Sequence, residues 1–187
     1  MRIDHRGTTL SVGRLLLRPW HDGDIPAIVA AYRDPAVRAG ARAPVTGEPE
    51  ARRWLELQDE GRESGVRHSF AVVEGADDGR GGEPVGNVTL KYPDPGSGRA
   101  EVGYWTVAGA RGRGIAPRAL GALTDWAFTV FADDGLVRLD LLHQVDNAAS
   151  CRVAEKSGYA LVEVLPAVPS WPQEGHRHRR CAPASGG

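Results

Sequence analysis

The most informative part of the sequence is VAGARGRGIAPRALGA, residues 107–122. The run before it, residues 99–107, is rich in β-branched and aromatic residues and predicts a strand. Pro117 suits the first turn of a helix, where a backbone N–H would have no partner anyway. Apolar residues then recur at helical spacing as far as Phe131. The sequence therefore predicts a strand, a glycine turn and a helix over residues 117–131.

The rest of the chain adds strands and helices on both sides of this unit. We expect strands over residues 15–18, 68–74, 84–92, 99–107, 138–143 and 159–164. Helices are expected from about Asp22 or Asp24 to Asp34-Pro35, and over residues 49–62, 117–131 and 148–157. Short turns join the middle strands into an antiparallel meander, and a β–α–β–α–β order follows. The prediction is a single α/β (α+β) domain over residues 1–187 around one mixed sheet. Residues 75–83 are expected to form a hairpin loop, and residues 182–187 a frayed tail.

Composition excludes several classes of protein. A chain of 187 residues, 41% hydrophobic and 25% charged, has the size and composition of one globular domain. Its formal net charge of −1 provides no basic field, so we expect neither a nucleic acid nor a membrane as partner. The two cysteines, Cys151 and Cys181, are too few for a disulfide framework and favour a cytoplasmic location.

The glycine turn has the features of a phosphate site. Glycines let the backbone turn tightly and approach a ligand closely, and the first amides of a helix have no internal partners. These amides and the helix dipole favour an anion such as phosphate. Arg111, Arg113 and Arg118 would add positive charge. The spacing fits neither a P-loop nor a dinucleotide-binding fingerprint. The alternative is a tight connection with solvated arginines.

The turn resembles the acyl-CoA motif of the GNAT N-acetyltransferase superfamily, Q/R-x-x-G-x-G/A, which Arg111, Gly114 and Ala116 match. This resemblance implies that backbone amides of the turn hold the pyrophosphate of coenzyme A. The cofactor-binding residues it implies are Trp105, Thr106, Val107, Arg111, Gly112, Arg113, Gly114, Ile115, Ala116, Asn147 and Ser150.

A second motif, VDNAASCRVAEKSGY over residues 145–159, resembles the N-x-x-S…A-x-x-x-G-[FY] stretch of the Rim-type branch, which includes ribosomal-protein N-terminal acetyltransferases. Two earlier segments also resemble sequences of that branch: RLLLRP at residues 14–19 and YRDP at residues 32–35. The resemblance covers about residues 14–165. It implies a mostly antiparallel sheet with a V-shaped splay between two parallel central strands, and helices on both faces.

Local preferences and the resemblance assign roles within the second motif. Asn147 is a good helix N-cap and Gly158 a good residue just beyond a helix end. The resemblance implies that Asn147 also binds the pantetheine arm. It further implies that the Ser150 hydroxyl lies near the thioester sulfur, where it could protonate the leaving thiolate.

Glu101 is the candidate general base. It shares a strand face with Gly103 and Trp105, and in the family a Glu on this strand often serves as base. A carboxylate that reaches the amine through water would help it to lose its proton. The alternative is a surface Glu paired with Arg99.

Other side chains are assigned less specifically. Trp105, His143 and Arg38 are candidates to line the acceptor cleft, together with the loop over residues 37–46. We expect Cys151 to be a buried thiol. The run HRHRR at residues 176–180 shows no cysteine or carboxylate at ligand spacing, so we interpret it as a solvated last strand and expect no metal.

The predicted function is an N-acetyltransferase that moves the acetyl group of acetyl-CoA directly to a primary amine in a ternary complex. The acceptor would be a protein N-terminal α-amine or a small-molecule amine such as an antibiotic, and a homodimer is expected from relatives. Two alternatives remain open at this point. One is a non-catalytic acyl-CoA-binding module, and the other is an acyltransferase that uses a longer donor such as succinyl-CoA.

Overall fold

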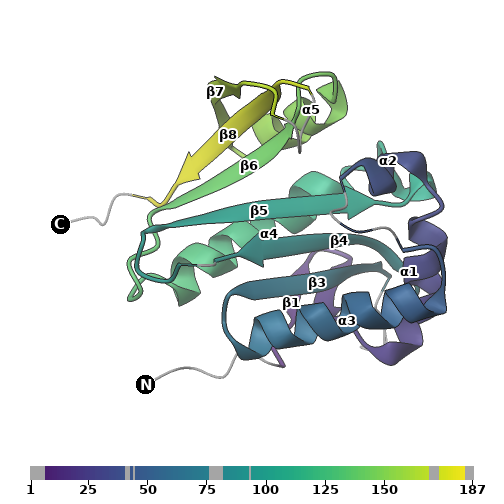
Figure 1. Ribbon diagram of the computed structural model, residues 1–187. Helices are drawn as coiled ribbons and strands as arrows, with labels where there is room; N and C mark the ends of the chain where they lie inside the picture. Colours follow the sequence, from purple (N-terminus) through teal and green to yellow (C-terminus); the bar gives the residue numbers. More distant parts are fainter. Residues whose placement is uncertain are drawn as a thin grey trace.

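The computed structural model describes residues 7–40, 43, 45–75, 82–92, 94–168 and 173–183. Eight strands form one sheet in the order β1-β2-β3-β4-β5-β6-β8-β7 (Figure 1). The strands are β1 (Leu10–Val12), β2 (Leu15–Pro19), β3 (Arg67–Glu74), β4 (Pro84–Lys91), β5 (Arg99–Thr106), β6 (Arg138–Gln144), β7 (Ala160–Leu165) and β8 (Gly175–Cys181). The helices are η1 (Asp22–Asp24), α1 (Ile25–Ala31), α2 (Pro35–Ala39), α3 (Glu48–Glu63), η2 (Ala108–Ala110), α4 (Ile115–Val130) and α5 (Ala148–Lys156).

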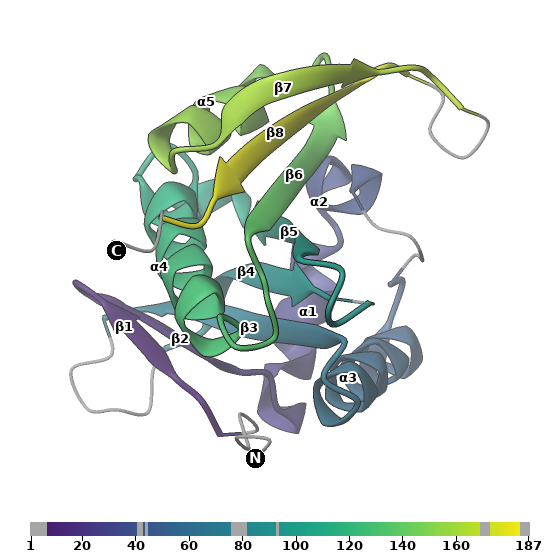
Figure 2. The same ribbon diagram turned by 90° about the vertical axis from the view of Figure 1, so that its left-hand side faces the viewer.

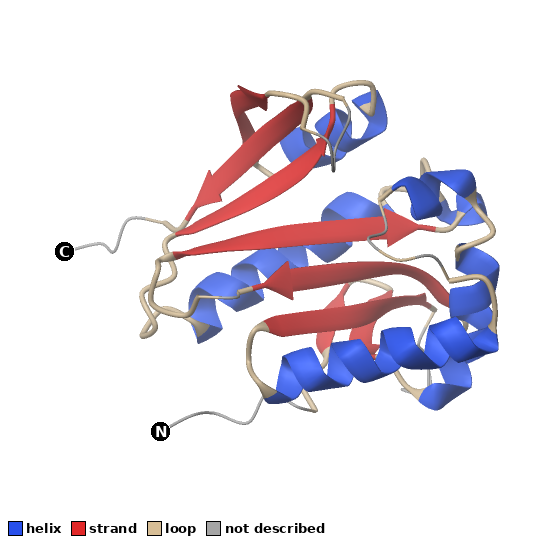
Figure 3. Cartoon of the chain, in the orientation of Figure 1, coloured by secondary structure: helices blue, strands red, loops and turns tan. Residues whose placement is uncertain are grey.

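The sheet opens between its two central strands. β5 and β6 form the parallel pair, whereas the other strand pairs described are antiparallel. Pairing joins Arg99–Val102 to residues 138–141 and ends there. Beyond Val102 the two strands diverge, as Figure 3 shows in red. The predicted V-shaped splay and the mixed sheet are therefore confirmed.

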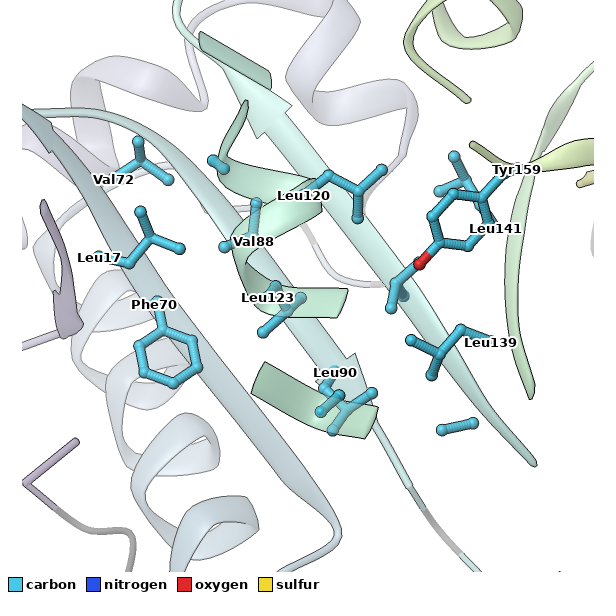
Figure 4. Packing of buried hydrophobic residues seen from close by; sticks show 14 of the residues in the cluster. Leu17, Phe70, Val72, Val88, Leu90, Leu120, Leu123, Leu139, Leu141 and Tyr159 are labelled. Carbon is cyan, nitrogen blue, oxygen red and sulfur yellow. The ribbon is translucent and has the colours of Figure 1, made fainter. Parts of the chain in front are cut away.

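Helices cover both faces of the sheet (Figure 2). α4 and α5 pack on one face, where the apolar stripe of α4 meets residues of the central strands. Figure 4 shows part of this core, with Leu120 and Leu123 of α4 against Val88 and Leu90 of β4. Helices α1 and α3 pack on the opposite face around a smaller aromatic cluster that includes Trp20. The amphipathic pattern of each helix explains this two-sided arrangement.

A buried ion pair links β2 to the start of α1. Two Arg18 nitrogens donate to the two carboxylate oxygens of Asp24, at 2.7 and 2.8 Å. Asp24 is 3% exposed and also accepts from the backbone N–H of His21. This bidentate geometry compensates both charges for the loss of water.

The structure adds elements that the sequence did not predict. β1 and α2 lie in stretches expected to be irregular, and α4 begins at Ile115, two residues earlier than predicted. β8 is not a solvated last strand, because it inserts between β6 and β7 and buries His178 at 1% exposure. Residues 76–81 of the expected hairpin loop and residues 184–187 of the expected tail lie outside the described residues. Within the described part of the chain, no helix is both long and apolar enough to cross a membrane.

Candidate acyl-CoA site

The glycine turn joins η2 to α4 and has a left-handed backbone at two positions. Gly112 has φ of +74° and Gly114, the N-cap of α4, has φ of +72°. L-residues rarely adopt these values, which explains why glycine is needed at both positions. A Cβ at either position would meet no heavy atom within 4 Å, so the space above the turn is open.

Five consecutive amides of this turn have no hydrogen-bond partner in the part of the chain that the structure describes. Among the described residues, no hydrogen bond is donated by the backbone N–H of any residue from Gly112 to Ala116. The next amide, that of Arg118, already donates to the Gly114 carbonyl at 3.4 Å. A row of free amides at the positive end of a 16-residue helix is a strong anion site.

The arginines of the turn are tied to carboxylates. Arg111 donates to Asp34 at 2.5 Å, and Arg113 donates to Glu74 at 2.6 Å. The positive charge predicted from Arg111 and Arg113 is therefore offset by carboxylates from distant parts of the chain. Arg118 differs, because its Nε donates to the Gly114 carbonyl at 3.1 Å and no carboxylate pairs with it among the described residues. The two pairs fasten the turn to α2 and β3, although exposed pairs of this kind add only about 0–1 kcal/mol each. Attraction for an anion then rests mainly on the amides.

A pair of hydroxyl groups connects β5 to α5. The Tyr104 hydroxyl lies 2.9 Å from Ser150 Oγ, and either atom can donate. Burial raises the pKa of Tyr104, so its hydroxyl stays protonated at neutral pH. Asn147 caps α5 by accepting from the Ser150 N–H at 3.1 Å, which confirms the predicted cap. Tyr104 was not predicted as a partner of Ser150, although its hydroxyl on the strand beside the glycine turn was a usable signal.

Glu101 lies on the other face of β5. Its carboxylate accepts from Lys91 Nζ at 2.5 Å, so its partner is Lys91 and not Arg99, the partner that the alternative interpretation gave it. Together they line a pocket of ≈ 420 Å³ beside the C-terminal end of α3. Alternation along the strand explains the arrangement: Tyr104 faces the α4 side, whereas Glu101 and Trp105 face the α3 side. The structure therefore separates Glu101 from Ser150 instead of bringing them together.

The three predicted acceptor residues lie in different places. Trp105 packs in the aromatic cluster, 5.9 Å from Trp20 between ring centroids. Arg38 is exposed at the end of α2, where it donates to the backbone carbonyls of Tyr32 and Arg33. His143 is buried on β6. Arg42 of the expected cleft loop lies outside the described residues.

Comparison with protein families identifies this arrangement. The model of the acetyltransferase (GNAT) domain matches residues 14–160. The chain belongs to the GNAT acetyltransferase family. The resemblance inferred from the two motifs is thereby confirmed for most of the chain. No curated protein matches this GNAT chain.

Solved structures share the fold at low sequence identity. An acetyltransferase from Salmonella typhimurium that modifies the N-terminal serine of ribosomal protein L7/L12 has a TM-score of 0.78 and 18% identity, over 94% of this chain and 100% of that one. Mycobacterium smegmatis RimJ, in complex with CoA-disulfide, has a TM-score of 0.75 and 20% identity, over 94% and 87%. The microcin C7 self-immunity acetyltransferase MccE, with acetyl-CoA and AMP, has a TM-score of 0.75 and 16% identity, over 91% and 94%. At these identities the likeness shows the GNAT fold.

Proposed function

We propose that this GNAT protein transfers the acetyl group of acetyl-CoA directly to a primary amine. The observation that carries the proposal is the row of five free amides at the start of α4, beside the splay. The residues fit the cofactor, because free amides suit a pyrophosphate and open space lies above Gly112 and Gly114. Bound acetyl-CoA would supply an activated thioester.

The chain's own groups would hold each part of the cofactor. The amides of residues 112–116 would bind the pyrophosphate, and the ion-paired Arg111 and Arg113 would keep the turn in place. Pantetheine would run along the backbone from Trp105 to Val107 at the end of β5, beyond the point where pairing with β6 stops. The Val107 N–H already donates to the Val85 carbonyl at 3.0 Å, so it is not one of the groups left for the ligand. Asn147 would bind the pantetheine arm with hydrogen-bonding capacity that its cap does not use.

The two faces of β5 would divide the proton transfers. The Ser150–Tyr104 pair on the α4 side would deliver a proton to the leaving thiolate, with Tyr104 replenishing Ser150. Glu101 on the α3 side would accept a proton from the amine through water. Lys91 competes for that carboxylate, so the amine must approach on the oxygen that Lys91 leaves free. Trp105 would border the acceptor on the same face.

The energy of amine deprotonation favours an α-amine as acceptor. Deprotonating a side-chain amine of pKa ~10.4 at pH 7 costs about 4.6 kcal/mol of free energy, whereas deprotonating an α-amine of pKa ~7.8 costs only about 1 kcal/mol. The Salmonella neighbour is described as acting on a protein N-terminus. A protein N-terminal α-amine is therefore the first acceptor class to test, with small-molecule amines such as antibiotics second.

A thiol-release assay tests the proposal. Purified protein is mixed with acetyl-CoA and a panel of peptides with free N-termini, the same peptides with blocked N-termini, and amine antibiotics. Release of free thiol that depends on an amine, with a matching gain in acceptor mass, is the expected result. Binding of coenzyme A without thiol release for any amine would favour the non-catalytic acyl-CoA-binding module. Faster turnover with succinyl-CoA in direct competition would favour the longer donor.

We also propose that the chain forms a homodimer through β7 and works in the cytoplasm. β7 is an edge strand, and its Leu161, Val162 and Val164 are about half exposed. Apolar side chains on an open edge favour pairing with another strand. Light scattering coupled to gel filtration would give twice the chain mass for the wild type and the single mass for Val162→Lys. A single mass for the wild type would overturn the dimer.

A further inference from the structure

Four side chains that can ligate a metal meet between β6, β8 and α5. The register pairs His143 of β6 directly with His176 of β8, and His178 pairs with Leu141. Residues directly opposite each other, and residues two apart on one strand, share a sheet face. All three histidines therefore face α5, where Cys151 lies in the first turn. These four residues are named the His₃Cys cluster below.

Two distances within the His₃Cys cluster match those between neighbouring ligands of a metal site. Cys151 Sγ lies 3.3 Å from His176 Nδ1 and 3.6 Å from His143 Nε2. One ligand atom from each of the four residues lies within 4.8 Å of the other three. Tetrahedral zinc, with bonds of about 2.0–2.3 Å, places neighbouring ligand atoms about 3.3–3.6 Å apart. Two of the contacts already have this separation, and the remaining ligand atoms, within 4.8 Å, would have to move closer when the metal binds.

Two of the histidines are oriented by backbone carbonyls. His143 Nδ1 lies 2.8 Å from the Gln144 carbonyl oxygen, and His178 Nδ1 lies 3.3 Å from that of Tyr159. A carbonyl only accepts, so each Nδ1 carries the proton and each Nε2 keeps a lone pair. Metal-binding histidines use this same outer-shell arrangement, which fixes the tautomer and the direction of the ring.

The free nitrogen of His178 gives an independent indication of a ligand. His178 is 1% exposed, and its Nε2 is buried without a hydrogen-bond partner among the described residues. Buried polar atoms are nearly always paired, so an orphan facing other ligand atoms needs an explanation.

We propose that the His₃Cys cluster binds one Zn²⁺ ion. Three imidazoles and one thiolate form a closed tetrahedral set with a charge and softness that suit zinc. On binding, the Cys151 thiol releases its proton to solvent and the sulfur donates a pair of electrons to the metal. Because four protein ligands leave no open position, the ion would be structural: it would tie the first turn of α5, which carries Ser150, to β6 and β8.

The sequence prediction of no metal rested on finding no cysteine or carboxylate partner at ligand spacing from the HRHRR run. The structure brings Cys151 to that run from 25 residues away in the chain. The proposal does not depend on the acetyltransferase reaction, and its test therefore uses no acetyl-CoA.

The test measures zinc on the purified full chain. The protein is stripped with a chelator and dialysed, and Zn²⁺ is then titrated in competition with a chromogenic chelator. Cys151→Ser and His176→Gln each remove one ligand, and His176 is only half-buried, so its variant spares the core. Cys181→Ser and His21→Gln are the matched controls, because both residues are exposed and lie outside the cluster.

We expect one Zn²⁺ per chain in the wild type and in both controls. Losing a ligand should weaken binding by more than the roughly 10- to 100-fold that loss of an outer-shell partner costs. Zinc at about 100 times its Kd should raise the melting temperature by about 5–10 °C in the wild type and not in Cys151→Ser. Co²⁺ in place of Zn²⁺ should add a thiolate-to-metal absorption band that Cys151→Ser lacks.

Several outcomes would overturn the site. Less than one bound ion per chain in the wild type would do so, as would a cobalt complex without the thiolate band. Zinc affinity in Cys151→Ser and His176→Gln equal to that of the controls would place the ion elsewhere. If Cys151→Ser proves unfolded, His176→Gln and the cobalt spectrum of the wild type still decide the matter.

Discussion

Replacing Gly114 with Asp should abolish coenzyme A binding with a limited loss of stability. Gly114 has φ of +72°, and a non-glycine residue in this conformation costs roughly 1–2 kcal/mol. A Cβ there meets nothing within 4 Å, so no packing clash is added. The protein should therefore stay folded, with a melting temperature lower by about 2–8 °C.

The effect on coenzyme A should be larger, because the new carboxylate would lie where the amides attract an anion. Two unit charges about 4 Å apart interact by about 4 kcal/mol at an effective dielectric constant near 20. Even half of this repulsion, about 2 kcal/mol, is a 30-fold loss of affinity, and the full amount is about 1000-fold.

Isothermal calorimetry with coenzyme A measures this loss, with two variants as controls. Gly114→Ala carries the backbone strain without the charge, so it should lose much less affinity. Gly109→Ala should bind as the wild type does, because Gly109 has no left-handed φ and a Cβ there has open space around it. Affinity of Gly114→Asp within about threefold of Gly114→Ala would refute the electrostatic reasoning.

Three other substitutions probe the remaining groups. Glu101→Gln should lower kcat/KM at pH 7 by about 10²- to 10⁴-fold. In a pH–rate profile, this loss should become smaller as the pH approaches the pKa of the amine. A loss that is the same at every pH would show that Glu101 is not the base. Tyr104→Phe leaves Ser150 without its hydroxyl partner, so steady-state kinetics should show kcat about tenfold lower with unchanged coenzyme A affinity, and an equal fall in affinity would argue for a binding role instead. Asp24→Ala leaves the buried Arg18 guanidinium without its carboxylate partner, so the free energy of unfolding in urea should fall by about 3–5 kcal/mol. A fall below about 1 kcal/mol would contradict a tight buried pair.

Features fixed by a few neighbouring residues could be predicted from the sequence. The glycine turn, the cap at Asn147 and the apolar stripe of α4 all depend on local preferences, and the structure has each of them. Gly158 follows the end of α5 with φ of +77°, as its position in the motif suggested. These features can be predicted because backbone conformation and helix ends depend mainly on adjacent residues.

Features that depend on pairing across the chain could not be predicted in the same way. Nothing near Arg111 in the sequence indicates that Asp34 neutralises it. The same holds for β8, whose insertion between β6 and β7 brings His178 to the buried inner face while its other polar side chains stay partly exposed. Polar composition alone suggested a solvated strand, because exposure depends on the neighbours that the sheet order supplies.

Binding of the diphosphate by the free amides is tested by following the backbone N–H resonances of residues 112–116 with ¹⁵N NMR. Coenzyme A is titrated in one experiment, and pantetheine, which lacks the pyrophosphate, in another. If the free amides bind the diphosphate, coenzyme A should shift the Gly112 and Gly114 resonances strongly, and pantetheine should leave them almost unmoved. Equal shifts with both ligands, or shifts with coenzyme A confined to other parts of the chain, would contradict the account.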